Sequence, residues 1–539
     1  MAPPLFKQSL AAARAAASHR LQAAIRRSGT DLVCAVTFGD VVHGLRGKAL
    51  LPHITSSLDV EQGFRFHFPD GLSGSLQEVL QGPLAPCTPA SVERRTFRLF
   101  VGRDPTLREL VEVQAFMRDA CNASAPFLEQ SGTSPKGPSG SQPEGTAVPA
   151  SSIPMHPMLR QASMLLHRQP HCSHMAKLAE EGGGLPKHQI HELFCEDSLR
   201  VIGSLLRTTA QSIELWADHE DYGTFLVRAC TSASDLAEGW YHDDSGRTMY
   251  FHSSGHDPNT SSVQYVSMNI SDDGAGEVSW QGTVIGDSVK VRNDRGVQMC
   301  GHIGCPSRSV QMADGEVWHR GRVSFSVQAE FMRLFTMIHA EHTAASVVTH
   351  ATALLASAWC DPFAAYAAGI LGFAGPLHGR ANQEFVRMLK ELRSWLGTAA
   401  CFPSRSTLQK WVDERLAAGK MVYGFGCKHP YPDPRYSMTV DFVHLHQLDC
   451  PNKFPMTSLA LHLGRELPTI LRESIRAVNP FPNPDAISGV LLDEILGMTD
   501  ETQHPAMLAQ ARAIGALATA SWHRALGLPI ERPQSVRIP

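Results

Sequence analysis

The sequence predicts a mainly helical protein that is interrupted by one β-rich segment. Apolar residues recur at three- and four-residue spacing in 107–120 and 191–216, and over most of the chain after Phe331. Between about 218 and 327, apolar and polar residues alternate, and turn sequences such as DSG, DDG and NDRG separate the runs. The 539 residues, 43% hydrophobic and 19% charged, are enough for a large core and roughly two to four domains.

Composition excludes several classes of protein. Lys and Arg total 48 against 52 Asp and Glu, so the net charge of −4 gives no drive toward nucleic acid. The longest apolar run, 344–360, contains Thr349 and His350, which predicts a buried helix and no transmembrane segment. The 12 Cys are scattered singly, which is typical of a reducing compartment.

Two segments are unusual in composition. Residues 1–30 carry five Lys or Arg and no acid, a pattern typical of an organelle transit peptide or of an Ala-rich surface helix with a basic face. Residues 131–154 are rich in Ser, Gly and Pro and predict a linker without a role in chemistry.

Two short Cys/His runs raise the question of a metal site. They are CGHIGC at 300–305 and HCSH at 171–174. Neither has a second ligand pair at the spacing that zinc sites use, so we expect no bound metal.

The strongest chemical signal is GPLHGRANQE at 375–384, where His378 follows a Gly-Pro-Leu turn and precedes a predicted helix. A His at a helix N-terminus can stay neutral and donate a hydrogen bond, because the helix dipole disfavours the imidazolium. By itself such a His is more often a cap or a packed loop residue than a site residue.

Four dispersed motifs together resemble citrate synthase in its mitochondrial form. They are GPLHGRANQE, GFG at 424–426 followed by DPRY at 433–436, PNPDAISGVLL at 482–492, and RALGLPIERPQS at 524–535. The resemblance covers nearly the whole chain except the Ser/Pro-rich segment and the β-rich segment, which it implies are insertions. It implies a two-domain helical fold, with 1–378 and 499–539 forming a large domain and 379–498 a small one.

The resemblance implies that acetyl-CoA condenses with oxaloacetate and that the thioester is then hydrolysed to citrate and CoA. Deprotonating a methyl group requires a base, and the developing enolate requires a donor. By the resemblance Asp485 is the base and His378 the donor. The oxaloacetate-binding residues implied are His342, Arg435, Arg512 and Arg532, the last acting in the partner subunit's site. Asn483 and Arg46 are implied to bind CoA.

Two positions depart from the family pattern. The His that should follow Gly-Phe-Gly and polarise the oxaloacetate ketone is Cys427, and a thiol is a weak donor. His429 lies two residues further on and is a candidate substitute. Ile487 also stands where the mitochondrial pattern has a second His.

These features leave three hypotheses. The first is an active citrate synthase: a homodimer of the mitochondrial matrix that needs no cofactor, because acetyl-CoA is a substrate. The second is a catalytically impaired structural or assembly subunit, in which the β-rich segment binds a protein partner. The third is a 2-methylcitrate synthase using propionyl-CoA, since one methylene changes discrimination by only about 1–3 kcal/mol.

Overall fold

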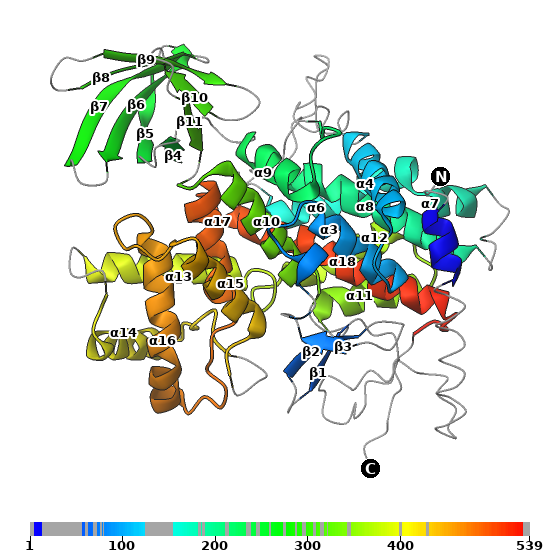
Figure 1. The fold of residues 1–539 in the computed structure, drawn as a ribbon. Helices are drawn as coiled ribbons and strands as arrows, with labels where there is room; N and C mark the ends of the chain where they lie inside the picture. Colours follow the sequence, from blue (N-terminus) through cyan, green and yellow to red (C-terminus); the bar gives the residue numbers. More distant parts are fainter. Residues whose placement is uncertain are drawn as a thin grey trace, which may run out of the picture.

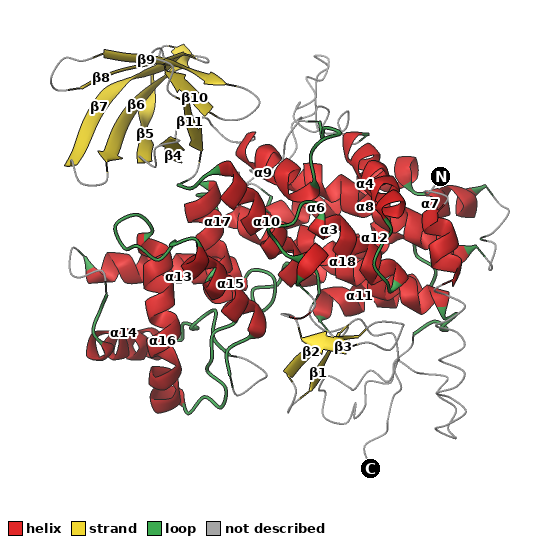
Figure 2. Cartoon of the chain, viewed as in Figure 1, coloured by secondary structure: helices red, strands yellow, loops and turns green. Residues whose placement is uncertain are grey.

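The computed structural model describes most of the chain after residue 80. The described residues are 5–12, 56–59, 63–67, 73–75, 78, 80–123, 155–181, 185, 189–210, 215–232, 239–243, 248–257, 260–272, 276–285, 288–293, 298–304, 309–312, 317–320, 322–341, 346–397, 402–426 and 431–531. Helices dominate them, as the red segments of Figure 2 show, so the predicted mainly helical class is confirmed.

The largest group of helices packs around one buried helix, α18 (His504–Ala525). All residues of α18 are buried, as expected for an Ala-rich helix without a continuous polar face. Around it lie α3 (Ser91–Val101), α4 (Leu107–Asn122), α6 (Pro157–Cys172), α7 (His174–Glu180), α8 (Ile190–Ala210), α9 (Tyr222–Ser232), α10 (Phe325–His339), α11 (Val347–Ser357) and α12 (Pro362–Phe373).

A second group of helices lies to the left in Figure 1. It contains α13 (Ala381–Leu396), α14 (Arg405–Ala417), α15 (Pro434–Leu445), α16 (Pro455–Ile475) and α17 (Ser488–Leu496). The described helices include none that is long and apolar enough to cross a membrane. The division into domains at 379 and 498 stays a prediction.

The β segment forms a closed antiparallel barrel of eight strands. The strands are β4 (Gly239–Asp243), β5 (Thr248–Asp257), β6 (Thr260–Asp272), β7 (Gly276–Ile285), β8 (Ser288–Asn293), β9 (Gln298–Gly304), β10 (Ser309–Met312) and β11 (Val317–Arg320). Each pairs with the next, and β11 pairs with β4. Val291 is buried while its neighbours Lys290 and Arg292 are exposed, which is the alternation of a half-buried strand.

The predicted start of the β segment, near residue 218, is wrong. Residues 222–232 form α9, because Phe225, Leu226 and Ala229 recur at helical spacing and are buried against the helical core. A separate small sheet of β1 (Ser56–Asp59), β2 (Gly63–His67) and β3 (Ser73–Ser75) was not predicted.

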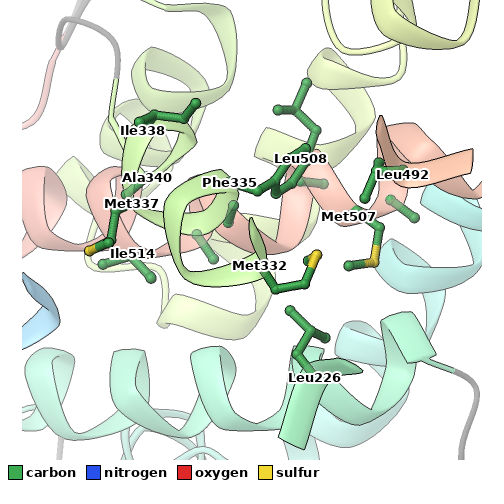
Figure 3. Packing of buried hydrophobic residues seen from close by; sticks show 14 of the residues in the cluster. Leu226, Met332, Phe335, Met337, Ile338, Ala340, Leu492, Met507, Leu508 and Ile514 are labelled. Atoms are coloured by element: carbon green, nitrogen blue, oxygen red, sulfur yellow. The ribbon is translucent and has the colours of Figure 1, made fainter. Parts of the chain in front are cut away.

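Helices α10 and α18 pack closely, and their contact sets the position of the site. Figure 3 shows Met332 and Phe335 of α10 beside Met507 and Leu508 of α18, all of them buried. Gly515 allows α18 to approach the end of α10 closely, because a Cβ at this position would lie 2.2 Å from the carbonyl oxygen of Ala340. The C-terminal end of α10 is therefore held against α18.

Candidate active site

A cavity of about 430 Å³ lies where α10, α12, α13, α15 and α18 meet three connecting segments, 376–378, 421–426 and 483–485. Five of the residues singled out from the sequence line it: His378, Arg435, Asn483, Asp485 and Arg512. The structure also brings His339 and Asp433 to the cavity. Five other candidates, His342, Cys427, His429, Arg532 and Arg46, lie outside the described residues.

His378 sits in the tight turn between α12 and α13. The turn is closed by hydrogen bonds from the His378 N–H to Gly375 O (3.1 Å) and from the Gly379 N–H to Phe373 O (2.8 Å). Position 379 must be glycine, because a Cβ there would lie 2.6 Å from Phe373 O. The imidazole packs edge-on against the Phe373 ring, with centroids 4.5 Å apart. The turn thus fixes the ring toward the cavity.

The His378 imidazole is neutral at physiological pH. Burial, helped by the positive charge of Arg512, lowers its pKa to about 4. Its Nε2 has no hydrogen-bond partner among the described residues. A neutral ring with a buried, unengaged nitrogen can donate a hydrogen bond to a ligand oxygen.

Asp485 lies in the short 3-10 turn η4 (Pro484–Ala486) that precedes α17. Asn483 caps this turn, since its Oδ1 accepts the Asp485 N–H at 3.0 Å. Two main-chain hydrogen bonds join the turn to the 424–426 segment. The Asn483 N–H donates to Gly424 O (2.9 Å), and the Gly426 N–H donates to Phe481 O (2.9 Å). Two stretches far apart in sequence therefore form one wall of the cavity.

Gly424 allows this close approach. Its φ of +78° is in the left-handed region, and a Cβ would lie 2.8 Å from both Ala486 Cα and the Phe385 ring. The packing of the Asp485 turn thus explains why the first position of the GFG motif is glycine.

Burial raises the pKa of Asp485 to about 6, and the positive charges of Arg435 and Arg512 oppose the rise. The carboxylate is therefore mostly ionised at neutral pH, yet a stronger base than an exposed Asp. It faces the same cavity as the neutral His378. A base and a donor on one cavity can together remove a proton next to a carbonyl group.

Arg512 supplies positive charge at the cavity. Its Nε donates a 2.6 Å hydrogen bond to the main-chain carbonyl of His339, and its Nη1 has no hydrogen-bond partner among the described residues. Burial lowers its pKa to about 10, so it remains protonated. Nη1 is therefore a donor available to an anionic ligand.

Arg435 is already engaged by Asp433. Its Nε bonds Asp433 Oδ1 (2.9 Å) and its Nη2 bonds Asp433 Oδ2 (2.8 Å), a two-pronged pair in which both side chains are buried. Asp433 also caps α15, because it accepts the Arg435 N–H at 2.9 Å. The sequence prediction did not foresee this internal pairing, which leaves less of the guanidinium fork for a ligand.

His339 and Asp433 are two polar cavity residues that the sequence interpretation did not single out. Burial lowers the pKa of His339 to about 3, so the ring is neutral; Nδ1 lies 2.8 Å from Phe335 O. The sequence feature that could have identified His339 is its place three residues before His342 in IHAEH. The feature that could have identified Asp433 is its N-cap position directly before Pro434.

The described residues contain no group of three or more His, Cys, Asp or Glu side chains that could hold a metal ion. Part of the CGHIGC run lies outside these residues.

Comparison with known proteins finds a similarity over the C-terminal part of the chain. Residues 307–534 match the family model described as citrate synthase, C-terminal domain. The chain is 40% identical over 210 residues to the probable mitochondrial citrate synthase of Glossina morsitans morsitans and to the mitochondrial citrate synthase of Kajikia audax. Each match covers 38% of this chain and 43% of the relative. The chain therefore matches less than half of the length of each relative.

The fold is shared with solved citrate synthases. The enzyme from Pyrobaculum aerophilum superposes with a TM-score of 0.55 at 16% identity, over 92% of both chains. The Thermoplasma acidophilum citrate synthase, solved with carboxymethyl coenzyme A and oxaloacetate, gives 0.53 at 13% identity over 90% of this chain and 92% of that one. The family-model match over 307–534 and the two relatives confirm the resemblance to citrate synthases that the motifs predicted, and the solved structures share the fold.

Proposed function

We propose that the protein is a citrate synthase, which condenses acetyl-CoA with oxaloacetate and hydrolyses the resulting thioester to citrate and CoA. The observation that carries the proposal is the meeting of Asp485, His378 and Arg512 at one cavity. No cofactor enters this reaction, since acetyl-CoA is a substrate.

The protonation states fit the first step. Asp485, ionised above pH 6, accepts a proton from the methyl group of acetyl-CoA. The neutral imidazole of His378 donates a hydrogen bond to the thioester oxygen, where negative charge develops. The enolate carbon then attacks the ketone of oxaloacetate, and a water molecule later cleaves the citryl thioester.

Oxaloacetate carries two carboxylates, so its site needs fixed cations. Arg512 presents Nη1 at the cavity, and Arg435 lines the same wall. We assign the remaining contacts to His342 and to Arg532 acting in the partner subunit's site. Asn483 and Arg46 are assigned to CoA, and Asn483 lies at the cavity.

We assign polarisation of the ketone to His429, in place of the His that Cys427 replaces. Gly426 and Asp433, on either side of this segment, both line the cavity. The substitution His429→Ala should then reduce turnover strongly, while Cys427→Ala should leave it nearly unchanged.

We further propose a homodimer in the mitochondrial matrix. Helices α11 and α12 expose the large apolar side chains of Val347, Leu354 and Leu371, which an interface would cover. Glu531, next to Arg532, is held beside α11 by a 2.9 Å bond from its N–H to Ser357 Oγ. The relatives described as mitochondrial support the compartment.

The decisive experiment measures release of the CoA thiol from acetyl-CoA, with and without oxaloacetate, for the wild type and for Asp485→Asn. We expect oxaloacetate-dependent release that falls by about 10²–10⁴ in the variant, the usual contribution of a general base. Absence of release from a folded dimer would favour the assembly-subunit hypothesis. Faster release from propionyl-CoA would favour the 2-methylcitrate synthase.

A further inference from the structure

Arg322 lies two residues after β11, where the chain leaves the barrel and returns to the helices. Its guanidinium is buried, and Nη1 donates hydrogen bonds to the main-chain carbonyl of Lys453 and to Glu494 Oε1, the latter at 3.3 Å. Lys453 precedes α16 and Glu494 lies on α17. The exit of the barrel is therefore attached to both of these helices.

Glu494 caps α16 from outside that helix. Its Oε1 accepts the Met456 N–H (3.1 Å) and its Oε2 accepts the Thr457 N–H (2.9 Å) and hydroxyl (2.6 Å). The N-cap residue of α16, Phe454, contributes no side-chain hydrogen bond of its own. The carboxylate thus satisfies amide groups that the first turn leaves unpaired, and its charge complements the helix dipole.

Helix α17 connects Glu494 to the turn that carries Asp485. Its first residue, Ser488, comes three positions after Asp485, and Glu494 lies six residues further along, which is about 1.7 helical turns. The turn itself is closed by short-range hydrogen bonds, from Ala486 N–H to Asn483 O (3.0 Å) and from Ile487 N–H to Pro484 O (3.3 Å). The orientation of the turn consequently depends on where α17 is fixed, together with the 424–426 segment on its other side.

We propose that Arg322 is a positioning residue for the Asp485 turn, acting through Glu494 and α17. This inference rests on the proposed function insofar as Asp485 is the base. Without Arg322, Glu494 would be a buried carboxylate without its cation, and α17 would lose its attachment to the barrel exit. Through this link, the barrel and the catalytic turn are mechanically connected.

The test uses full-length variants and two measurements. Arg322→Met removes the charge at nearly constant length, and Arg322→Lys keeps the charge without the fork. Glu494→Gln and the double variant Arg322→Met/Glu494→Gln test whether the arginine acts through the glutamate. Hydrogen exchange is measured at the Ala486 and Ile487 amides, and kcat and KM for oxaloacetate are measured by CoA release.

The matched control is Arg333→Met. Arg333 is also a buried arginine, on the helix that follows the barrel, α10, but it pairs with Asp221 directly before α9, at 2.7 Å. It therefore tests the loss of a comparable buried ion pair that does not involve α17.

We expect Arg322→Met to speed exchange at both amides about tenfold and to lower kcat, with KM for oxaloacetate little changed because Arg512 lies on a different helix. The double variant should match the stronger single variant. Arg333→Met should lower stability without faster exchange at these amides. If Arg322→Met does not fold, the same changes in Arg322→Lys, at smaller size, support the proposal.

Unchanged exchange at Ala486 and Ile487 in every folded Arg322 variant, or equal acceleration in Arg333→Met, would overturn the inference. A wild type that releases no CoA would instead refute the proposed function. In that case the exchange data still decide whether Arg322 positions the turn.

Discussion

Arg512 Nε donates a 2.6 Å hydrogen bond to the carbonyl oxygen of His339, which joins α18 to the end of α10 between two residues that line the cavity. The bond orients the guanidinium so that Nη1 is left for a ligand. One residue thus combines an interhelical contact with the cation that the substrate requires.

We predict that Arg512→Lys weakens oxaloacetate binding by about 10- to 100-fold. Lysine keeps the charge but cannot make both the His339 contact and a directed bond to the substrate, and a charged hydrogen bond contributes about 1.5–3 kcal/mol. Titration calorimetry with oxaloacetate measures the change. Arg207→Lys is the control, since Arg207 is a buried arginine that also bonds a main-chain carbonyl, Asn122 O, outside the cavity. Equal losses of affinity in both variants would contradict the assignment.

The pH dependence of turnover should follow Asp485. Its pKa of about 6 predicts that kcat/KM falls as pH decreases below 6, because the protonated carboxyl cannot accept the methyl proton. His378, with a pKa of about 4, remains neutral throughout and should add no second decline above pH 5. Rates of CoA release between pH 5 and 8 test this, and a profile that rises toward pH 5 would refute it.

Gly424→Ala should be much more damaging than Gly419→Ala. Both glycines have φ near +70° (+78° and +70°), so both variants carry the same backbone strain of roughly 1 kcal/mol. Only at 424 would the new Cβ also collide with Ala486 and Phe385; at 419 nothing lies within 4 Å. We expect a further loss of about 1–3 kcal/mol in urea unfolding and a loss of kcat in Gly424→Ala alone. Equal effects would show that the close approach to the Asp485 turn is unimportant.

Glu93 should make the protein less stable as pH rises. Burial, and next the negative charge of Asp221, raise its pKa from 4.5 to about 7. A carboxyl group whose pKa is raised by folding favours the folded state below its unfolded pKa, and this contribution is lost as pH rises toward 7. Glu93→Gln, which can still accept the Tyr222 N–H, should be more stable than the wild type at pH 8, by at most about 3 kcal/mol. Urea unfolding at pH 5 and pH 8 measures it, and no gain at pH 8 would contradict the prediction.

Several parts of the molecule followed from local patterns. The helical periodicity after Phe331, the Gly-Pro-Leu turn before His378 and the alternation in the β segment are set by neighbouring residues, and each is present in the structure. The boundary at 218 failed because α9 is an apolar helix whose Val and Thr content also suits a strand. The barrel's closure depends on pairing between β4 and β11, about 75 residues apart, which periodicity alone does not reveal.

The sequence by itself determined the helical class, the residue types of the site and the resemblance to citrate synthases, because motifs and periodicity are local properties of the chain. Only the tertiary structure decided that Asp433 holds Arg435, that His339 reaches the cavity and that Arg322 joins the barrel exit to Glu494. The tertiary structure also decided the protonation states of Asp485 and His378, because their pKa values depend on burial and on charges that folding brings close.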